Sequence, residues 1–139
     1  MMATEKPRPV PAAPRLARFR RRVRNTLIVL ALLVVGLGAL YLFAATRWSY
    51  SSGERAGYIQ KFSKKGWVCK TWEGEIAMAS FPGTAPQLFA FTVRDDAVAA
   101  AINRQLGSRV VLSYEQHLGL PGCLGETQYW VNGVRRAEP

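Results

Sequence analysis

Two short stretches of the chain combine basic and aromatic side chains in a way that suits binding. Aromatic rings stack on bases or sugar rings, and lysines pair with phosphates or carboxylates. The alternative is that half of the aromatics fill the core while the lysines form a solvated turn. The candidate binding surface comprises Lys64, Lys65, Trp67, Lys70, Trp72, Tyr129 and Trp130.

Acid–base chemistry has only weak candidates in this chain. Glu73 and Glu75 are two apart on an expected strand and therefore face the same side, but they flank a glycine at an expected bend, where solvated charges are ordinary. His117 is the only histidine, and no serine or cysteine stands near it in a recognisable motif, so it is expected to be a surface or loop residue. We therefore predict a non-enzymatic protein with no catalytic residues.

Nucleotide and metal sites are also disfavoured. The only G-x-G, Gly36-Leu37-Gly38, lies inside an apolar run, whereas a nicotinamide site needs a glycine-rich turn between a strand and a helix. The chain has no C-x-x-C, and one histidine cannot complete a set of metal ligands. No cofactor and no metal are expected.

Cys69 and Cys123 are the only cysteines, and an even pair in an oxidising compartment is a disulfide candidate. A bridge would close a long loop, worth about 4 kcal/mol in the chain-entropy model. The alternative is a pair of buried free thiols.

The apolar run at 26–46 has twenty-one residues without a charge, which predicts a transmembrane anchor helix. Such a helix is about 31 Å long, close to the ~30 Å hydrocarbon core of a bilayer. Residues 1–25 carry +7 of the net charge of +10 and form a basic, Pro-rich tail that we expect to be disordered. Basic flanks stay in the cytoplasm, which places the tail inside and residues 47–139 in the periplasm of a bacterium, with the anchor in the inner (plasma) membrane. The topogenic residues are Arg18, Arg20, Arg21, Arg22 and Arg24.

Three alternatives for the apolar run fit less well. A cleavable signal peptide has a shorter apolar stretch and small residues at −3 and −1, but cleavage after Ala44 or Ala45 would put Leu42 or Phe43 at −3. A buried core helix would show a polar face. The surroundings of the twin arginines indicate a plain topogenic cluster rather than a twin-arginine export signal.

The segment after the anchor predicts a linker at 47–53 and a small mainly-β domain at 54–136. Asp95 caps the one expected soluble helix, which ends at Gly107, and Gly74 in the second strand predicts a bulge or bend. Strands are expected at 57–62, 67–78, 88–93, 109–118 and 127–134.

This order predicts a five-stranded OB-like barrel with one helix between strands three and four. An SH3-like barrel is the alternative, but it does not normally hold a helix there. In an OB barrel the face of strands two and three, with the one–two and four–five loops, is the usual binding surface. Those loops hold the two cysteines and stand on the same side, so the thiols could meet.

Residues 65–74, KGWVCKTWEG, give the chain its most specific resemblance. With the preceding basic tail and anchor, it resembles a family of small uncharacterised single-pass bacterial membrane proteins with a K-G-x-x-x-K-T-x-E-G stretch after the anchor. A D-x-x-x-A helix and a Y-x-E/Q-x-L-G strand end follow there, here at 95–100 and 114–119. Some members carry a 6-phosphogluconate dehydrogenase label, which these residues do not support.

The sequence thus predicts a membrane-anchored periplasmic binding or accessory module that recognises another envelope protein. Membrane lipid and an envelope protein are the expected partners, and nucleic acid is not. The alternative is a structural subunit of a membrane complex held through its anchor helix. An enzyme of unrecognised class is a more distant alternative.

Overall fold

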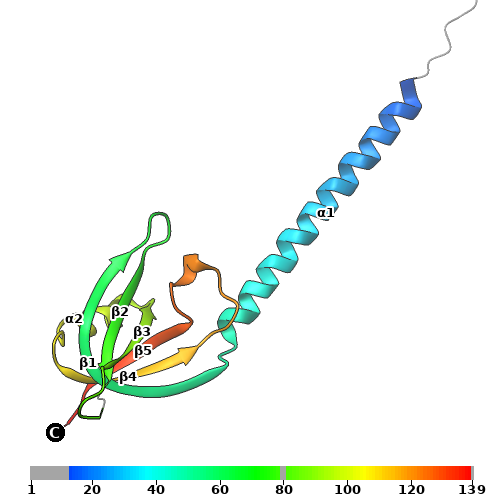
Figure 1. Ribbon diagram of the computed structural model, residues 1–139. Coiled ribbons are helices and arrows are strands. Elements are labelled where there is room, and N and C mark those ends of the chain that lie inside the picture. The colour runs from blue at the N-terminus through cyan, green and yellow to red at the C-terminus, as the bar shows by residue number, and fades with distance from the viewer. Residues whose placement is uncertain (1–12, 79–80, 139) are drawn as a thin grey trace, which may run out of the picture. The chain divides into compact units, whose positions relative to one another are not determined.

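The computed structural model describes residues 13–78 and 81–138. It divides into two compact units between Tyr41 and Leu42, and each is described by itself. The elements in chain order are α1 (Ala13–Arg47), β1 (Ser51–Lys65), β2 (Thr71–Met78), β3 (Gln87–Val93), α2 (Asp96–Asn103), β4 (Arg109–Gln116), the 3-10 turn η1 (Gly122–Leu124) and β5 (Tyr129–Arg136) (Figure 1).

Helix α1 is longer than the predicted anchor. It already begins at Ala13, so the predicted disorder of the tail is wrong for residues 13–25, and residues 1–12 lie outside the described part. Alanine, leucine and arginine are good helix formers, and a helix extends easily once a long apolar segment has nucleated it. Within the described residues, Arg15–Arg47 is the one helix long and apolar enough to cross a membrane. Its apolar side chains, from Leu27 to Phe43, are exposed.

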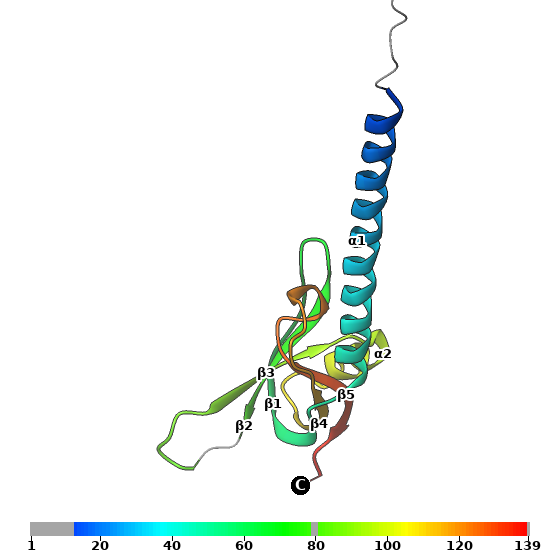
Figure 2. The same ribbon diagram turned by 90° about the vertical axis from the view of Figure 1, so that its right-hand side faces the viewer.

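The second unit is a five-stranded mixed sheet that closes into a ring in the order β1-β2-β3-β5-β4 (Figures 1 and 2). Strand β1 closes it by pairing antiparallel with both β2 and β4. The β3–β5 junction is parallel and, among the described residues, has one registered pair, Thr92 with Trp130. The ring is therefore uneven, with one thin seam. The predicted order of strands and helix is confirmed.

Strand boundaries differ from the predicted ones at the start of the domain. Strand β1 begins at Ser51, inside the predicted linker, because it pairs with β4 from its first residue. Strand β2 begins at Thr71 rather than at residue 67, so Trp67 lies in the β1–β2 loop.

Gly74 is not a bulge, because its pairing with β1 and β3 is in regular register. The bulge lies in β1, between Ile59 and Lys61. Gly74 instead makes room for aromatic rings: a Cβ here would lie 2.5 Å from Cζ of Phe91 and 2.8 Å from Cδ2 of Phe62.

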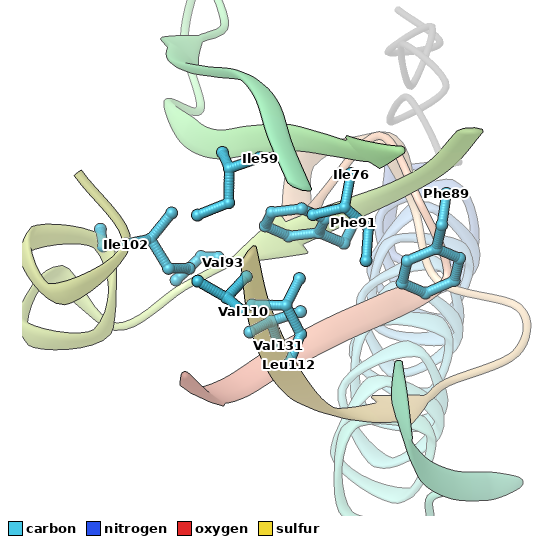
Figure 3. Packing of buried hydrophobic residues seen from close by; sticks show 10 residues of the cluster. Ile59, Ile76, Phe89, Phe91, Val93, Ile102, Val110, Leu112 and Val131 are labelled. Atoms are coloured by element: carbon cyan, nitrogen blue, oxygen red, sulfur yellow. The ribbon is translucent and has the colours of Figure 1, made fainter. Parts of the chain in front are cut away.

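The core fills the ring with side chains from every strand and from α2, as Figure 3 shows. Asp95 caps α2 as predicted, accepting hydrogen bonds from the backbone N–H groups of Ala97 (2.7 Å) and Val98 (3.4 Å). Ile102 of α2 is fully buried, whereas Leu106 lies beyond the end of α2, which ends at Asn103 rather than at the predicted Gly107, and is exposed. The buried hydrophobic residues are Ile59, Ile76, Phe89, Phe91, Val93, Ala99, Ile102, Val110, Leu112 and Val131.

Candidate functional site

An aromatic stack connects the core to the candidate binding surface. Trp72 stacks on Phe62 with ring centroids 5.2 Å apart and planes 5° from parallel, and Phe62 in turn contacts Phe91 of the core. The indole N–H of Trp72 donates to Oδ1 of Asp96 over 2.8 Å. The Nζ of Lys64 lies 5.2 Å from the Trp72 ring centroid and 3.8 Å from Asp96. Trp72 is thus half-buried and fixed in orientation, because it contacts both β1 and the start of α2.

This tryptophan forms one wall of an open hollow with a volume of about 260 Å³, which we call the cationic hollow. Three basic residues and one acidic residue line it, so its charge is net positive. The guanidinium of Arg94 lies 4.4 Å from the ring centroid of Trp130, an arrangement that holds a cation in place without neutralising it. The lining residues are Lys64, Cys69, Lys70, Thr71, Trp72, Val93, Arg94, Asp96, Cys123 and Leu124.

A disulfide between Cys69 and Cys123 forms another part of the wall of the hollow. Their Cα atoms are 5.2 Å apart, and the bond joins the β1–β2 loop to η1 in the β4–β5 loop. The predicted pairing is confirmed, and the alternative of buried free thiols is wrong. An ion pair, Lys65 Nζ to Glu126 Oε2 at 3.2 Å, connects the same two segments.

Glu73 lies on the outer face of the sheet, buried under the β4–β5 loop at 5% exposure. Its Oε1 accepts from the Thr71 hydroxyl (2.7 Å) and from the backbone N–H of Glu126 (3.1 Å). Its Oε2 accepts from the Thr92 hydroxyl over 2.7 Å. The Thr92 hydroxyl oxygen also accepts from the backbone N–H of Thr127 over 3.2 Å. The prediction of a solvated carboxylate at a bend is wrong for Glu73, which instead holds the loop over the thin β3–β5 seam.

His117 lies in the loop directly after β4, as predicted, but it is buried at 3% exposure, so the predicted surface position is wrong. Its ring lies 4.3 Å from that of Trp130, and its Nδ1 is 3.1 Å from the carbonyl oxygen of Ala45. Its Nε2 lies 3.5 Å from Oε2 of Glu115. His117 thus packs on Trp130 and contacts the carbonyl oxygen of Ala45 and the carboxylate of Glu115. We interpret its role as structural.

The structure brings together only part of the predicted binding surface. Lys64, Lys70 and Trp72 line the cationic hollow, and Lys65 pairs beside it. Trp67 lies in the β1–β2 loop and is fully exposed. Tyr129 does not reach this surface: it packs in the core beside Phe89, with ring centroids 4.9 Å apart, because β5 turns it inward.

Sequence reasoning missed Arg94 and Asp96 as members of the site. Both lie at the β3–α2 junction, where an acid such as Asp96 in the first turn of a helix is already accounted for by the helix dipole. The available signal was the position of the junction, which follows β3. Strand β3 pairs with β2, and in that pairing Trp72 lies opposite Val93, the residue just before Arg94. The topogenic arginines from Arg18 to Arg24 lie on α1 and are exposed.

A helix able to span a membrane, followed by a five-stranded ring that carries a cationic hollow, defines a small two-part protein with a helix and a sheet-rich domain. The chain belongs to the family described as "Domain of unknown function (DUF8785)", whose model matches residues 48–138. The match begins directly after α1 ends and covers the whole sheet domain. No curated protein matches the chain.

Proposed function

We propose that this protein is a non-enzymatic, membrane-anchored binding module whose OB-like domain recognises an acidic segment of an envelope protein. The OB-like assignment is supported by five strands in a ring with one helix between the third and fourth strands. It is also supported by the position of the hollow, which lies between the β1–β2 and β4–β5 loops, where OB folds usually bind their ligands.

The proposed location is extracytoplasmic, with the N-terminal end of α1 in the cytoplasm. The positive-inside rule supports this orientation, because arginines crowd the N-terminal side of the apolar run. The disulfide supports it independently, since such bonds persist in oxidising compartments such as the bacterial periplasm.

The single observation that carries the proposed function is the charge of the hollow. Lys64, Lys70 and Arg94 line it against one acid, Asp96. Arginine and lysine bind carboxylates through charge-assisted hydrogen bonds, which are about twice as strong as neutral ones. In a periplasm, where nucleic acid is not an ordinary ligand, an acidic protein segment fits this chemistry best.

A binding role is also supported by the contacts of Glu73, the carboxylate best placed for acid–base chemistry. Glu73 is engaged in three hydrogen bonds that fix the fold, and the β4–β5 loop covers it. We propose that its role is structural.

The test is quantitative affinity capture with the full-length protein in mild detergent, comparing charge reversals. Lys70→Glu and Arg94→Glu each reverse a cation in the hollow, and Arg136→Glu reverses an exposed one at the end of β5. Loss of one charge-assisted contact is worth about 1.4 kcal/mol or more, so capture of the partner should weaken about tenfold or more. Arg136→Glu should leave capture unchanged.

The alternative, a subunit held through its anchor helix, gives the opposite result. Replacing residues 26–46 with an unrelated apolar anchor should then abolish capture, while the charge reversals change nothing. If both charge reversals leave capture at the wild-type level, the proposed site is wrong.

A further inference from the structure

The β1–β2 tip, residues 66–70, carries two apolar side chains that the fold does not use. Trp67 is 101% exposed and Val68 is 94% exposed, more than any other large hydrophobic residue of the described chain. Burying a tryptophan is strongly favourable, so a fully exposed one next to an exposed valine indicates a surface that something else covers.

The tip is held in this exposed conformation. Gly66 adopts a φ of +126°, and a Cβ there would collide with the carbonyl oxygen of Cys69, so the turn requires glycine. The disulfide of Cys69 and the ion pair of Lys65 with Glu126 hold both sides of the turn against the β4–β5 loop. Figure 1 shows the β1–β2 hairpin projecting from the ring of strands.

The chemistry around the tip is basic. Between Lys61 and Trp72 the sequence has four lysines and no acid. Lys64 and Lys65 pair with Asp96 and Glu126, whereas Lys70 is the last residue of the tip itself. A protein–protein contact normally buries about 800 Å² per partner around a central hot spot, whereas here two apolar side chains stand alone within a basic surround. Tryptophan beside lysines is instead the composition that favours the interface of an anionic bilayer.

A bilayer is also the partner that the proposed anchor guarantees. Only residues 48–50 separate α1 from β1, and Trp48 and Tyr50 are themselves 81% and 72% exposed. The sheet domain is therefore tethered within three residues of the proposed anchor.

We propose that the β1–β2 tip inserts Trp67 and Val68 into the headgroup region of the outer leaflet, with Lys70 on anionic headgroups. This proposal rests on the proposed anchoring of α1. It adds a second membrane contact, which would fix the orientation of the cationic hollow toward partners in the same membrane.

The test is quenching of tryptophan fluorescence by brominated lipid, using the full-length protein in nanodiscs that contain phosphatidylglycerol. The test variants are Trp67→Phe and Trp48→Phe. The matched control is Phe81→Trp in the Trp67→Phe background, which places a tryptophan beyond the opposite end of β2. Phe81 is also exposed (85%), but the described residues around it carry no lysine. Trp67→Phe should remove a quenched component of the emission, and Phe81→Trp should not restore it. Replacing phosphatidylglycerol with phosphatidylcholine, or changing Lys70→Gln, should reduce the quenched share due to Trp67.

The outcomes separate the two proposals. If Trp48→Phe removes quenched emission but Trp67→Phe does not, the tip stays in water and this inference is overturned while the anchor stands. If neither change removes quenched emission, the proposed anchoring is wrong as well. If Trp67 is unquenched and Trp67→Phe weakens capture of an envelope protein, the tip is a protein contact, which also overturns the inference.

Discussion

The buried carboxylate of Glu73 accepts a hydrogen bond over 3.1 Å from the backbone N–H of Glu126, fifty-three positions further along the chain. This contact joins β2 to the β4–β5 loop. It lies beside the junction of β3 and β5, which has a single registered pair, Thr92 with Trp130. The ring therefore depends at its thinnest point on a side chain rather than on a strand ladder.

Glu73→Gln should destabilise the sheet domain by about 1–3 kcal/mol, because an amide nitrogen cannot accept a hydrogen bond and one buried donor loses its partner. The measurement is the free energy of unfolding of the full-length protein in detergent. Glu75→Gln is the matched control, since Glu75 is less buried and lies two residues away on the same strand. Its effect should stay within about 0.5 kcal/mol. Equal effects of the two variants would contradict the structural role of Glu73.

Gly74→Ala should destabilise the domain by about 1–3 kcal/mol, since overpacking forces neighbouring groups to shift. The added methyl group would lie 2.5 Å from Phe91 and 2.8 Å from Phe62, and both rings belong to the packed aromatic stack. Gly133→Ala is the control, because its Cβ would meet Ser113 at an ordinary 3.7 Å. Thermal unfolding should show a clear loss for Gly74→Ala and little change for Gly133→Ala. The opposite order would show that the aromatic stack is not as tight as described.

Removal of the Cys69–Cys123 bond should cost about 4 kcal/mol, because the crosslink closes a loop with a sequence separation of 54. Thermal unfolding with and without reductant, together with a Cys69→Ser/Cys123→Ser variant, measures this loss. The double variant should melt like the reduced wild type and gain nothing from oxidising conditions. Full alkylation of both thiols in protein taken from intact cells would contradict the bond.

Acid should remove the contribution of Glu54 to the stability of the folded domain. The pKa of Glu54 is lowered below its ordinary value of 4.5. The main causes are the hydrogen bond and the charge of Arg135, whose Nη2 lies 2.8 Å from Oε2 of Glu54. A weaker hydrogen bond from Ser113 adds to them. A group whose pKa is lower in the folded state stabilises the fold above its unfolded pKa, and this stabilisation is lost as the pH falls through the folded pKa. Glu54→Gln should therefore lower the Tm at pH 7 and have no effect in strong acid. A deficit that is the same at both pH values would show that it does not come from this ion pair.

The sequence was sufficient where the residue types alone carry the signal. Asp95 lies directly before an amphipathic run and caps α2, and the two cysteines pair as an even set does in an oxidising compartment. The order of strands and helix followed from alternation and turn residues in the same way.

The candidate site was less predictable because it depends on long-range pairing. Trp67 has high strand propensity, but the turn at Gly66 and the disulfide keep it out of β2. Tyr129 and Trp130 are adjacent in sequence, yet one packs in the core and the other stacks on His117, since neighbours on a strand face opposite sides. Arg94 enters the hollow because β3 pairs with β2, and no local pattern marks it.

The central claim is that a disulfide-bonded binding domain stands outside the cytoplasm on a retained anchor. Fusing alkaline phosphatase or a fluorescent protein to the C-terminus in bacterial cells tests it most directly, because the first is active only after export and the second fluoresces only in the cytoplasm. We predict an active phosphatase and a dark fluorescent protein, both in the membrane fraction. A fluorescent fusion with inactive phosphatase, or an active phosphatase released as a soluble cleaved product, would contradict the claim.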